Sequence, residues 1–271
     1  MNLIKIFETV IEQKRFPDKT LLIQYRVFYK ADANITWVFE DDSELWTLIA
    51  LTRHVQQHGI GVSLYMPYIP NGRQDRVKED GDVFTLKYFC DVINGLGFKT
   101  VTVRDAHSNV SLALLNNVIQ EPVEPFIETA INESKPHLLF YPDEGSQKRY
   151  SEKIKMPSIF GIKKRAWKTG DIIGLDVFGE VPNEPFDVLI VDDICSKGGT
   201  FFQSANKLKE LGARNIDLYV THCENSILEG EFTEKKITLL ETGLIRNVFT
   251  TQSVFTLSHP QIKIIGGTCN E

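Results

Sequence analysis

The stretch from Val188 to Thr200 constrains the fold of this 271-residue chain more than any other. It reads Val-Leu-Ile-Val-Asp-Asp-Ile-Cys-Ser-Lys-Gly-Gly-Thr, and a helical pattern begins at Phe201. Four apolar residues are typical of a buried strand, two carboxylates follow at its end, and small residues form a turn. Such strand–turn–helix units build parallel α/β sheets. An ordinary turn with solvated acids is the alternative interpretation.

The turn in this stretch has the composition of a phosphate-binding loop. Small residues such as Gly198 and Gly199 let backbone N–H groups point into one concave space, and the N-terminus of the following helix carries partial positive charge. Open parallel sheets bind ligands at the carboxyl ends of their strands, where Asp192 and Asp193 would meet the hydroxyls of a sugar. The stretch therefore predicts a phosphosugar site.

Apolar strand patterns alternate with helical patterns through most of the chain. Ser43 stands at the N-cap of the first predicted helix, and Gly212 follows the last one as a C-terminal stop. The alternation predicts an α/β protein with a mostly parallel sheet flanked by helices. Strands are predicted at residues 35–39, 60–66, 100–103, 138–141, 188–191 and 216–220, and helices at residues 43–57, 83–94 and 201–211.

A weak internal repeat indicates two similar halves. In each half a Leu-Gly helix stop leads through a short basic turn into a strand and then to a histidine, from Gly97 to His107 and from Gly212 to His222. Chance is the competing explanation, because helix–glycine–strand units are common in α/β folds.

The chain is long enough for one large domain or two of ordinary size. The proline-rich residues 121–126 are the expected boundary between the two halves. We therefore place an N-terminal domain at residues 1–124 and a C-terminal domain at residues 125–271.

Charge and composition narrow the class of protein. The net charge of −6 disfavours non-specific binding to nucleic acid. No window of ~18 uncharged apolar residues occurs, so no membrane span is expected. The N-terminus lacks the apolar stretch of a signal peptide. The four cysteines show neither metal-ligand spacing nor a disulfide framework, which favours a cytoplasmic protein: Cys90, Cys195, Cys223 and Cys269.

Three further segments place polar residues at the ends of predicted strands. Arg73, Gln74 and Asp75 follow two prolines that hold their loop extended, and an arginine fork suits phosphate oxygens. His107 follows another strand, where it would ligate a metal or contact phosphate. Asp143 follows a third, where it would hold magnesium or ribose hydroxyls. The plainer interpretations are a solvated loop, a structural histidine and a helix cap.

A short basic run, Lys163-Lys164-Arg165 with its neighbours, stands in an acidic chain. It is either a solvated loop or a movable lid that brings cations to a polyphosphate as charge develops on it.

These segments, in this order, resemble the ribose-phosphate pyrophosphokinase (PRPP synthetase) family over about residues 15 to 265. Residues 192–200 resemble the PRPP loop that the family shares with type I phosphoribosyltransferases. Residues 67–76 resemble its Pro-Tyr-x-x-x-x-Arg-Gln-Asp segment and residues 105–107 its Asp-Leu-His. Likewise, residues 142–145 resemble Pro-Asp-x-Gly, residues 163–165 the Lys-x-Arg of the catalytic loop, and residues 15–18 the start of Arg-Phe-x-Asp-Gly-Glu.

The resemblance implies two type I phosphoribosyltransferase-like domains, the first with an ATP-binding loop and the second with the sugar-phosphate loop. It implies transfer of the β,γ-diphosphate of ATP to the anomeric hydroxyl of ribose 5-phosphate, giving PRPP and AMP. Magnesium is the implied cofactor, and the implied assembly is a homo-oligomer of at least two chains. Lys163 and Arg165 would stabilise the transition state.

The resemblance also implies the binding residues. His107, which counts among the catalytic residues, and Asp143 would hold or orient magnesium. The residues expected to contact ATP are Arg73, Gln74 and Asp75, together with Phe16 and Asp18 from a neighbouring subunit. The ribose hydroxyls would be bound by Asp192 and Asp193, and the 5-phosphate by Ser196, Lys197, Gly198, Gly199 and Thr200.

Two departures from the family pattern bear on the substrates. Lys19 and Thr20 replace Gly-Glu in the ATP loop. Ser196 and Lys197 replace the usual Asp-Thr in the sugar-phosphate loop, which loses an acid and gains a lysine. A more positive loop would suit a bulkier or more anionic 5′ substituent, so ADP-ribose, as in NAD salvage, is a rival acceptor.

Two other classes of function stay open. A phosphoribosyltransferase that consumes PRPP would need a base-binding hood and only one α/β domain. A non-catalytic regulatory relative would tend to lose the cations of the catalytic loop, whereas this chain keeps Lys163 and Arg165.

Overall fold

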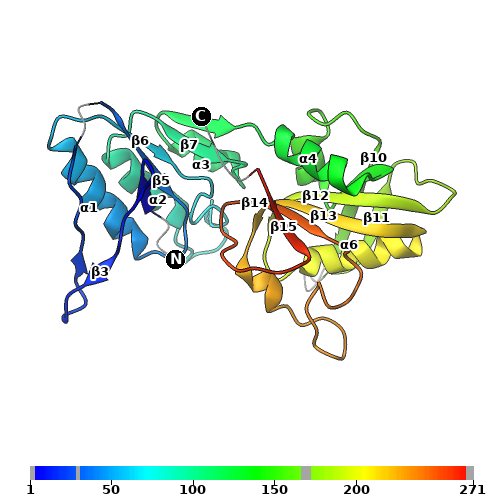
Figure 1. Ribbon diagram of the computed structural model, residues 1–271. Helices are drawn as coiled ribbons and strands as arrows, with labels where there is room; N and C mark the ends of the chain where they lie inside the picture. The colour runs from blue at the N-terminus through cyan, green and yellow to red at the C-terminus, as the bar shows by residue number, and fades with distance from the viewer. Residues whose placement is uncertain (1–3, 29–30, 166–171, 267–271) are drawn as a thin grey trace. The chain divides into compact units, whose positions relative to one another are not determined.

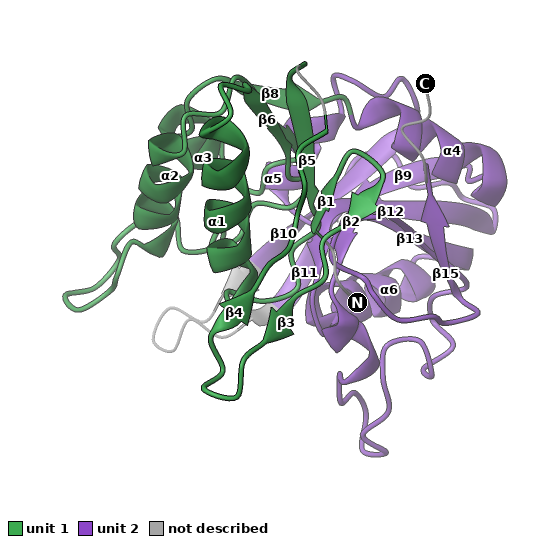
Figure 2. Cartoon of the chain, turned by 60° about the vertical axis from the view of Figure 1, so that its left-hand side comes forward, with its two compact units in different colours: residues 1–122 green, residues 123–271 purple. Residues whose placement is uncertain are grey.

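The computed structural model of the chain describes residues 4–28, 31–165 and 172–266. Two compact units divide the chain, unit 1 at Met1–Pro122 and unit 2 at Val123–Glu271 (Figure 2). Each unit holds one large, mostly parallel sheet with helices packed on it (Figure 1), and this confirms the predicted α/β class.

Unit 1 is built on a six-stranded sheet with three helices beside it. In chain order its elements are β1 (Ile4–Ile6), β2 (Thr9–Val10), β3 (Lys14–Arg15), β4 (Leu21–Leu22), β5 (Ala33–Trp37), α1 (Glu44–Gln56), β6 (Val62–Tyr65), α2 (Thr85–Gly95), β7 (Val101–Arg104), α3 (Asn109–Leu114) and β8 (Val118–Glu121). The sheet order is β2-β1-β5-β6-β7-β8, and β3 pairs with β4 in a separate hairpin. Strands β5 to β8 are parallel, and β1 joins β5 in the antiparallel sense.

Only one face of the unit 1 sheet is apolar. In β5 the side chains of Ala33, Ile35 and Trp37 are buried, whereas Asn34 between them is exposed. The buried side chains share one core with the apolar sides of α1 and α2, and Figure 2 shows α1, α2 and α3 together on one side of the sheet. The period-two pattern of β5 is therefore that of a half-covered sheet, which is unusual for parallel strands.

Unit 2 is built on a seven-stranded sheet in the order β11-β10-β9-β12-β13-β14-β15. In chain order its elements are α4 (Glu124–Ser134), β9 (Leu138–Tyr141), α5 (Glu144–Tyr150), β10 (Ser158–Arg165), β11 (Ile172–Phe178), β12 (Phe186–Cys195), α6 (Gly199–Glu210), β13 (Ala213–Cys223), the 3-10 turn η1 (Asn225–Leu228), β14 (Val248–Thr251) and β15 (Ile262–Ile265). Neighbouring strands are parallel except for β10 and β11.

Both faces of the unit 2 sheet are covered. Phe140 belongs to a core that includes the apolar side of α6, whereas the adjacent Tyr141 belongs to a second core with residues of α4 and α5. Figure 1 shows α4 and α6 on opposite sides of the strands. A strand buried on both faces needs a continuous apolar run, and this explains why β9 and Val188–Val191 of β12 show no alternation.

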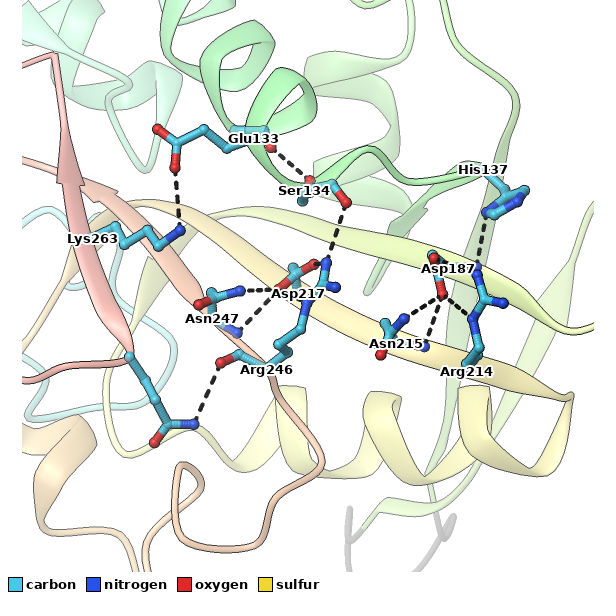
Figure 3. Close-up of polar contacts among 12 residues, drawn as sticks. Glu133, Ser134, His137, Asp187, Arg214, Asn215, Asp217, Arg246, Asn247 and Lys263 are labelled. Carbon is cyan, nitrogen blue, oxygen red and sulfur yellow. Dashed lines mark hydrogen bonds and ion pairs between the residues drawn. The ribbon is translucent and has the colours of Figure 1, made fainter.

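Two equivalent polar clusters join neighbouring strands near their amino ends in unit 2 (Figure 3). In the first, the carboxylate of Asp187 accepts hydrogen bonds from Nε and Nη2 of Arg214, at 3.0 and 2.8 Å, and from the side chain of Asn215 at 2.8 Å. The second repeats the same residue types one strand along the sheet, with Asp217, Arg246 and Asn247. We call these clusters the strand clamps.

Most predicted elements are present, with shifted ends. The strand predicted at residues 188–191 continues to Cys195, because β12 keeps pairing with β13 as far as Cys223. The sequence analysis placed Asp192 and Asp193 after the end of the strand. Both residues instead lie within it. The following helix begins at Gly199, before the predicted residue 201.

Helix ends differ in how well the sequence predicted them. Gly212 has a φ of +95°, as a glycine that stops a helix requires. Ser43 is the N-cap residue of α1, as predicted, but its side chain makes no capping hydrogen bond. In the described ranges, no helix has both the length and the apolar character needed to span a membrane.

Candidate functional site

The carboxyl edge of the unit 2 sheet gathers several of the predicted residues. Strands β10, β9 and β12 are adjacent and parallel, so their carboxyl ends meet at one edge. Asp143 directly follows the turn after β9, Lys163 lies near the end of β10, and Asp192 lies near the end of β12. Strand order therefore brings together three residues that are far apart in the sequence.

Asp143 is the N-cap of α5. Its Oδ1 accepts a hydrogen bond from the backbone N–H of Ser146 at 3.1 Å, and the hydroxyl of Ser146 lies 3.3 Å from the backbone N–H of Asp143. This confirms the plainer interpretation of a helix cap. The second oxygen, Oδ2, lies 3.5 Å from Nζ of Lys163, so one carboxylate serves both the helix and the sheet edge.

Lys163 connects Asp143 to the phosphate-type loop. Its Nζ also donates to Oγ1 of Thr200 at 3.3 Å, and its side chain is only 19% exposed. Gly161 makes this path possible, because a Cβ there would come within 3.0 Å of the carbonyl oxygen of Pro142. Strand β10 thus passes directly against the turn that leads to Asp143.

The loop from Ser196 to Thr200 enters α6 through two glycines. Gly198 has a φ of +94°, in the left-handed region that favours glycine, and a Cβ there would lie 2.7 Å from Cδ2 of Leu239. No side chain caps the N-terminus of α6. The first N–H groups of this helix are therefore left for solvent or an anion.

The two acids of β12 lie in a crowded, partly buried place. Asp193 is buried, its carboxylate lies 3.4 Å from the guanidinium of Arg149, and its N–H donates to Asp192 at 3.0 Å. Burial first, and then the charges of Asp193 and Asp143, raise the pKa of Asp192 well above its usual value. A cation or a set of hydroxyl donors would relieve this crowding.

In unit 1, the predicted Arg73–Asp75 loop lies against His107. A Cβ at Gly72 would lie 3.8 Å from Cβ of His107. Asp75 is buried and bonded to its neighbour Arg76 at 2.6 and 2.7 Å, and this guanidinium holds the pKa of the carboxyl well below its ordinary value. The Asp75 charge is thus already balanced within its own loop.

Gln74 also belongs to the fixed part of this loop. Its side-chain oxygen accepts a hydrogen bond from Oγ1 of Thr85 at 2.7 Å, at the first residue of α2. His107, in contrast, is exposed at the end of its strand.

The β3–β4 hairpin carries the predicted Phe16 and Asp18. Phe16 is 50% exposed, and Asp18 accepts hydrogen bonds from the N–H and hydroxyl of Thr20 at 2.9 and 2.6 Å. Lys19 has a φ of +70°, although it is not a glycine. The turn therefore keeps the backbone shape that a glycine would favour, and Thr20 holds the carboxylate of Asp18.

Part of the predicted basic run lies outside the described part of the chain, namely the side chains of Lys164 and Arg165 and residues 166–168. The backbones of Lys164 and Arg165 form the end of β10.

The acids of unit 2 are suitable ligands for magnesium. Among the residues that the structure describes, no three His, Cys, Asp or Glu side chains are clustered as metal ligands. The predicted pair is divided, with His107 in unit 1 and Asp143 in unit 2. Asp143, Asp192 and Asp193 nevertheless supply the carboxylate oxygens that Mg²⁺ prefers, and their mutual repulsion is relieved by a cation.

Sequence reasoning missed three residues at this edge. The first is Arg149, which pairs with Asp193. Its position on the helix that begins after Asp143 could have indicated that it lies near the site. Gly161 and Ser226 gave no such signal. Gly161 sits inside an apolar strand pattern, and Ser226 lies 30 residues from its contact at Ser196.

A separate cavity of about 660 Å³ lies in unit 1 between residues 23–26 and α1. It contains none of the predicted site residues. His54 on its wall is already bonded on both ring nitrogens, to the carbonyl of Tyr25 at 3.0 Å and to Gln57 at 2.9 Å. We therefore place the candidate site by its chemistry, at the edge of unit 2.

Three known proteins that are similar in sequence carry the same name. No family model matches the chain. It is 26% identical over 226 residues to a protein from Saccharolobus solfataricus and 28% identical over 222 residues to one from Pyrococcus abyssi, both named "Ribose-phosphate pyrophosphokinase". A third, from Thermococcus kodakarensis, bears the same name and is 27% identical over 238 residues. These matches cover 78 to 80% of this chain and 75 to 78% of the relatives.

A solved structure has the same fold. The phosphoribosylpyrophosphate synthetase from Mycobacterium smegmatis superposes with a TM-score of 0.75 at 16% identity, over 94% of this chain and 85% of the other. Sequence and fold together support the predicted family.

Proposed function

We propose that this relative of the ribose-phosphate pyrophosphokinases is a magnesium-dependent diphosphokinase that transfers the β,γ-diphosphate of ATP to a ribose with a phosphorylated 5-hydroxyl, releasing AMP. The observation that supports this best is the position of Lys163, bonded to Thr200 of the phosphate-type loop and 3.5 Å from Asp143. A cation held there faces both a bound sugar phosphate and the acids that would hold a metal.

The acceptor sugar would bind along the end of β12. Backbone N–H groups at the start of α6 and the hydroxyl of Thr200 would take the 5-phosphate. Asp192 and Asp193 would accept hydrogen bonds from the ribose hydroxyls, with the ion pair to Arg149 holding the Asp193 carboxylate in place. This arrangement would leave the anomeric hydroxyl free to attack the β-phosphorus of ATP.

Lys163 and Arg165 would offset negative charge on the transferring diphosphate. Phosphoryl-type transfer needs little covalent chemistry from the protein, so positioning and charge stabilisation supply most of the rate. Because the Lys163 ammonium is largely shielded from water, its charge is more effective than that of a surface lysine.

ATP would be bound mainly by unit 1. The Arg73 and Gln74 side chains would contact it from a loop that the Asp75–Arg76 pair holds in shape. Phe16 and Asp18 would approach the adenine from a neighbouring subunit. Magnesium, held by Asp143 and the acids of β12, would neutralise the phosphates of ATP.

The experiment offers the purified chain ATP and Mg²⁺ with either ribose 5-phosphate or ADP-ribose, and measures AMP. Ribose 5-phosphate is the acceptor expected from the family, while the replacement of Asp-Thr by Ser196 and Lys197 favours the bulkier ADP-ribose. AMP with one acceptor identifies it. No AMP with either would refute a diphosphokinase of this kind.

A second assay separates the other classes of function. A phosphoribosyltransferase would consume PRPP in the presence of a nucleobase and would make no AMP from ATP. A non-catalytic regulatory relative would do neither, although it could still bind the sugar phosphate.

A further inference from the structure

Residues 224–239, here called the support segment, pack against the back of the phosphate-type loop. A Cβ at Gly230 would lie 2.5 Å from the carbonyl oxygen of Lys197, so the two backbones are in close contact. One residue later in the loop, a Cβ at Gly198 would lie 2.7 Å from Cδ2 of Leu239, so this side chain packs directly on the glycine. The shape of the loop is thus set by a segment that the sequence analysis left without a role.

The support segment also makes a polar contact with the loop. The hydroxyl of Ser226 lies 3.1 Å from the hydroxyl of Ser196, and it donates to the carboxylate of Glu224 at 3.0 Å. The N–H of Glu224 in turn donates to the carbonyl of Cys195 at 2.8 Å, which ties the carboxylate-bearing residue to the start of the loop.

The direction of this chain of hydrogen bonds follows from counting protons. A serine hydroxyl carries one proton and two lone pairs. The proton of Ser226 goes to the carboxylate of Glu224, because a charged acceptor makes the stronger bond. Ser196 must then donate its own proton to Ser226, which leaves only its lone pairs for any other partner.

Thr200 has the opposite arrangement. Its Oγ1 accepts from the ammonium of Lys163 at 3.3 Å, so its proton is available to an anion bound in the loop. The two hydroxyls of the loop are therefore directed differently by their partners.

We propose that Ser226, oriented by Glu224, is a positioning residue that turns the proton of Ser196 away from the ligand of the phosphate-type loop. This rests on the proposed function only in taking that loop as the phosphate site. Phosphate oxygens are acceptors, so an anion must break the Ser196–Ser226 bond before Ser196 can donate to it. Ser226 thus weakens the binding of a bare phosphate and favours a ligand with a donor group at that place.

The test titrates the full-length ¹⁵N-labelled chain with inorganic phosphate, without ATP, and follows the amide resonances of Gly198 and Gly199. In Ser226→Ala the hydroxyl of Ser196 has no partner at position 226, so phosphate no longer has to break that hydrogen bond. Phosphate should therefore bind about three- to tenfold more tightly, which corresponds to one hydrogen bond. The gain should disappear in a Ser196→Ala background. Ser226→Cys, with its weak hydrogen bonds, should shift the affinity in the same direction and serves if the alanine variant folds poorly.

Ser111→Ala is the matched control, because Ser111 also makes a local hydrogen bond, to the carbonyl of Ser108 at 2.6 Å, but lies on α3 in unit 1. Its affinity for phosphate should equal that of the wild type. Weaker or unchanged binding in Ser226→Ala, or a gain that persists without Ser196, would overturn the proposal, as would no phosphate binding at Gly198 and Gly199. Failure of the proposed function looks different: no AMP forms, while the phosphate titrations still respond as stated.

Discussion

Lys163 and Asp143 each have two partners at the candidate site. Asp143 caps α5 with one oxygen and faces Lys163 with the other. Lys163 in turn lies between Asp143 and Thr200. A mostly buried lysine with an acid on one side and a hydroxyl on the other is held in a fixed direction. These single contacts decide where a developing negative charge would be stabilised.

Replacing Lys163 with alanine should lower kcat for AMP formation by about 10²- to 10³-fold, the usual loss when one group that stabilises transition-state charge is removed. The KM for the sugar should change far less. Steady-state AMP release measures both. Lys153→Ala is the control, since its ammonium pairs with Glu124 at 3.4 Å on the outside of unit 2 and activity should persist. Unchanged turnover in Lys163→Ala would contradict the role proposed for this residue.

At the scale of elements, β12, its loop and α6 depend on what packs against them. The loop needs a glycine at 198 for two separate reasons, a left-handed backbone and the closeness of Leu239. The strands, in turn, are joined at their amino ends by the strand clamps, which repeat one arrangement of Asp, Arg and Asn on successive strands (Figure 3). One end of the sheet thus supplies the site and the other fixes strand pairing.

Gly198→Ala should abolish detectable binding of inorganic phosphate to the loop and destabilise unit 2 by more than the ~1–2 kcal/mol of backbone strain alone. Gly212→Ala isolates the strain, because Gly212 has a φ of +95° but open space where a Cβ would lie. Thermal unfolding and the phosphate titration measure the two effects. Equal destabilisation by both substitutions, with phosphate binding retained, would show that the contact with Leu239 does not matter.

Stability at acid pH should depend on the first strand clamp. Arg214, and then Asn215, lower the pKa of Asp187 to about 2. Because the folded pKa is below the unfolded one of about 3.9, the carboxylate stabilises the fold above pH 4, and this contribution is lost as pH falls toward 2. Arg214 is 59% exposed, so we expect only about 1 kcal/mol from the pair.

Asp187→Asn tests this contribution. The variant should unfold at lower urea concentration than the wild type at pH 7, and the difference should shrink steadily between pH 4 and pH 2. Glu210→Gln, which removes an exposed ion pair with Lys207, should show little difference at either pH. A gap between Asp187→Asn and the wild type that stays constant down to pH 2 would argue against the clamp.

At the scale of the whole molecule, the two units differ in how their sheets are buried. Unit 2 has a core on each face of its sheet, whereas the described core of unit 1 lies on one face. The proposed roles follow the same division, with the sugar phosphate in unit 2 and most ATP contacts in unit 1. Two-sided burial gives unit 2 a rigid edge on which Lys163, Asp143 and Asp192 can hold their positions.

Hydrogen exchange should reflect this difference in burial. Amides of β12 at Val188–Val191, buried and hydrogen-bonded in the middle of their sheet, should exchange only when unit 2 unfolds. Amides of β8, a half-exposed edge strand of unit 1, should exchange much faster. Mass spectrometry of peptides after deuterium labelling measures both. Equal protection of β8 and β12 would contradict the expected order.

Local sequence determined the elements of this protein and their chemistry. Apolar runs and helical periodicity predicted β9, Val188–Val191 of β12 and the helices α1, α2 and α6, because burial selects these patterns within a few residues. Turn chemistry predicted the helix stop at Gly212, which has the positive φ that such a stop requires. The acids and the lysine could be proposed as site residues by residue type and by place at strand ends.

Only the tertiary structure decided which of these residues meet. The order β10-β9-β12 brings Lys163 to Asp143 and Thr200, although β12 follows β10 and β11 in the chain. Continued pairing with β13 carried β12 through both acids, which local composition could not indicate. The Ser196–Ser226 bond depends on a segment folding back over the loop. Such contacts depend on strand order and crossovers, which are selected by the packing of the whole sheet and not by any short stretch of sequence.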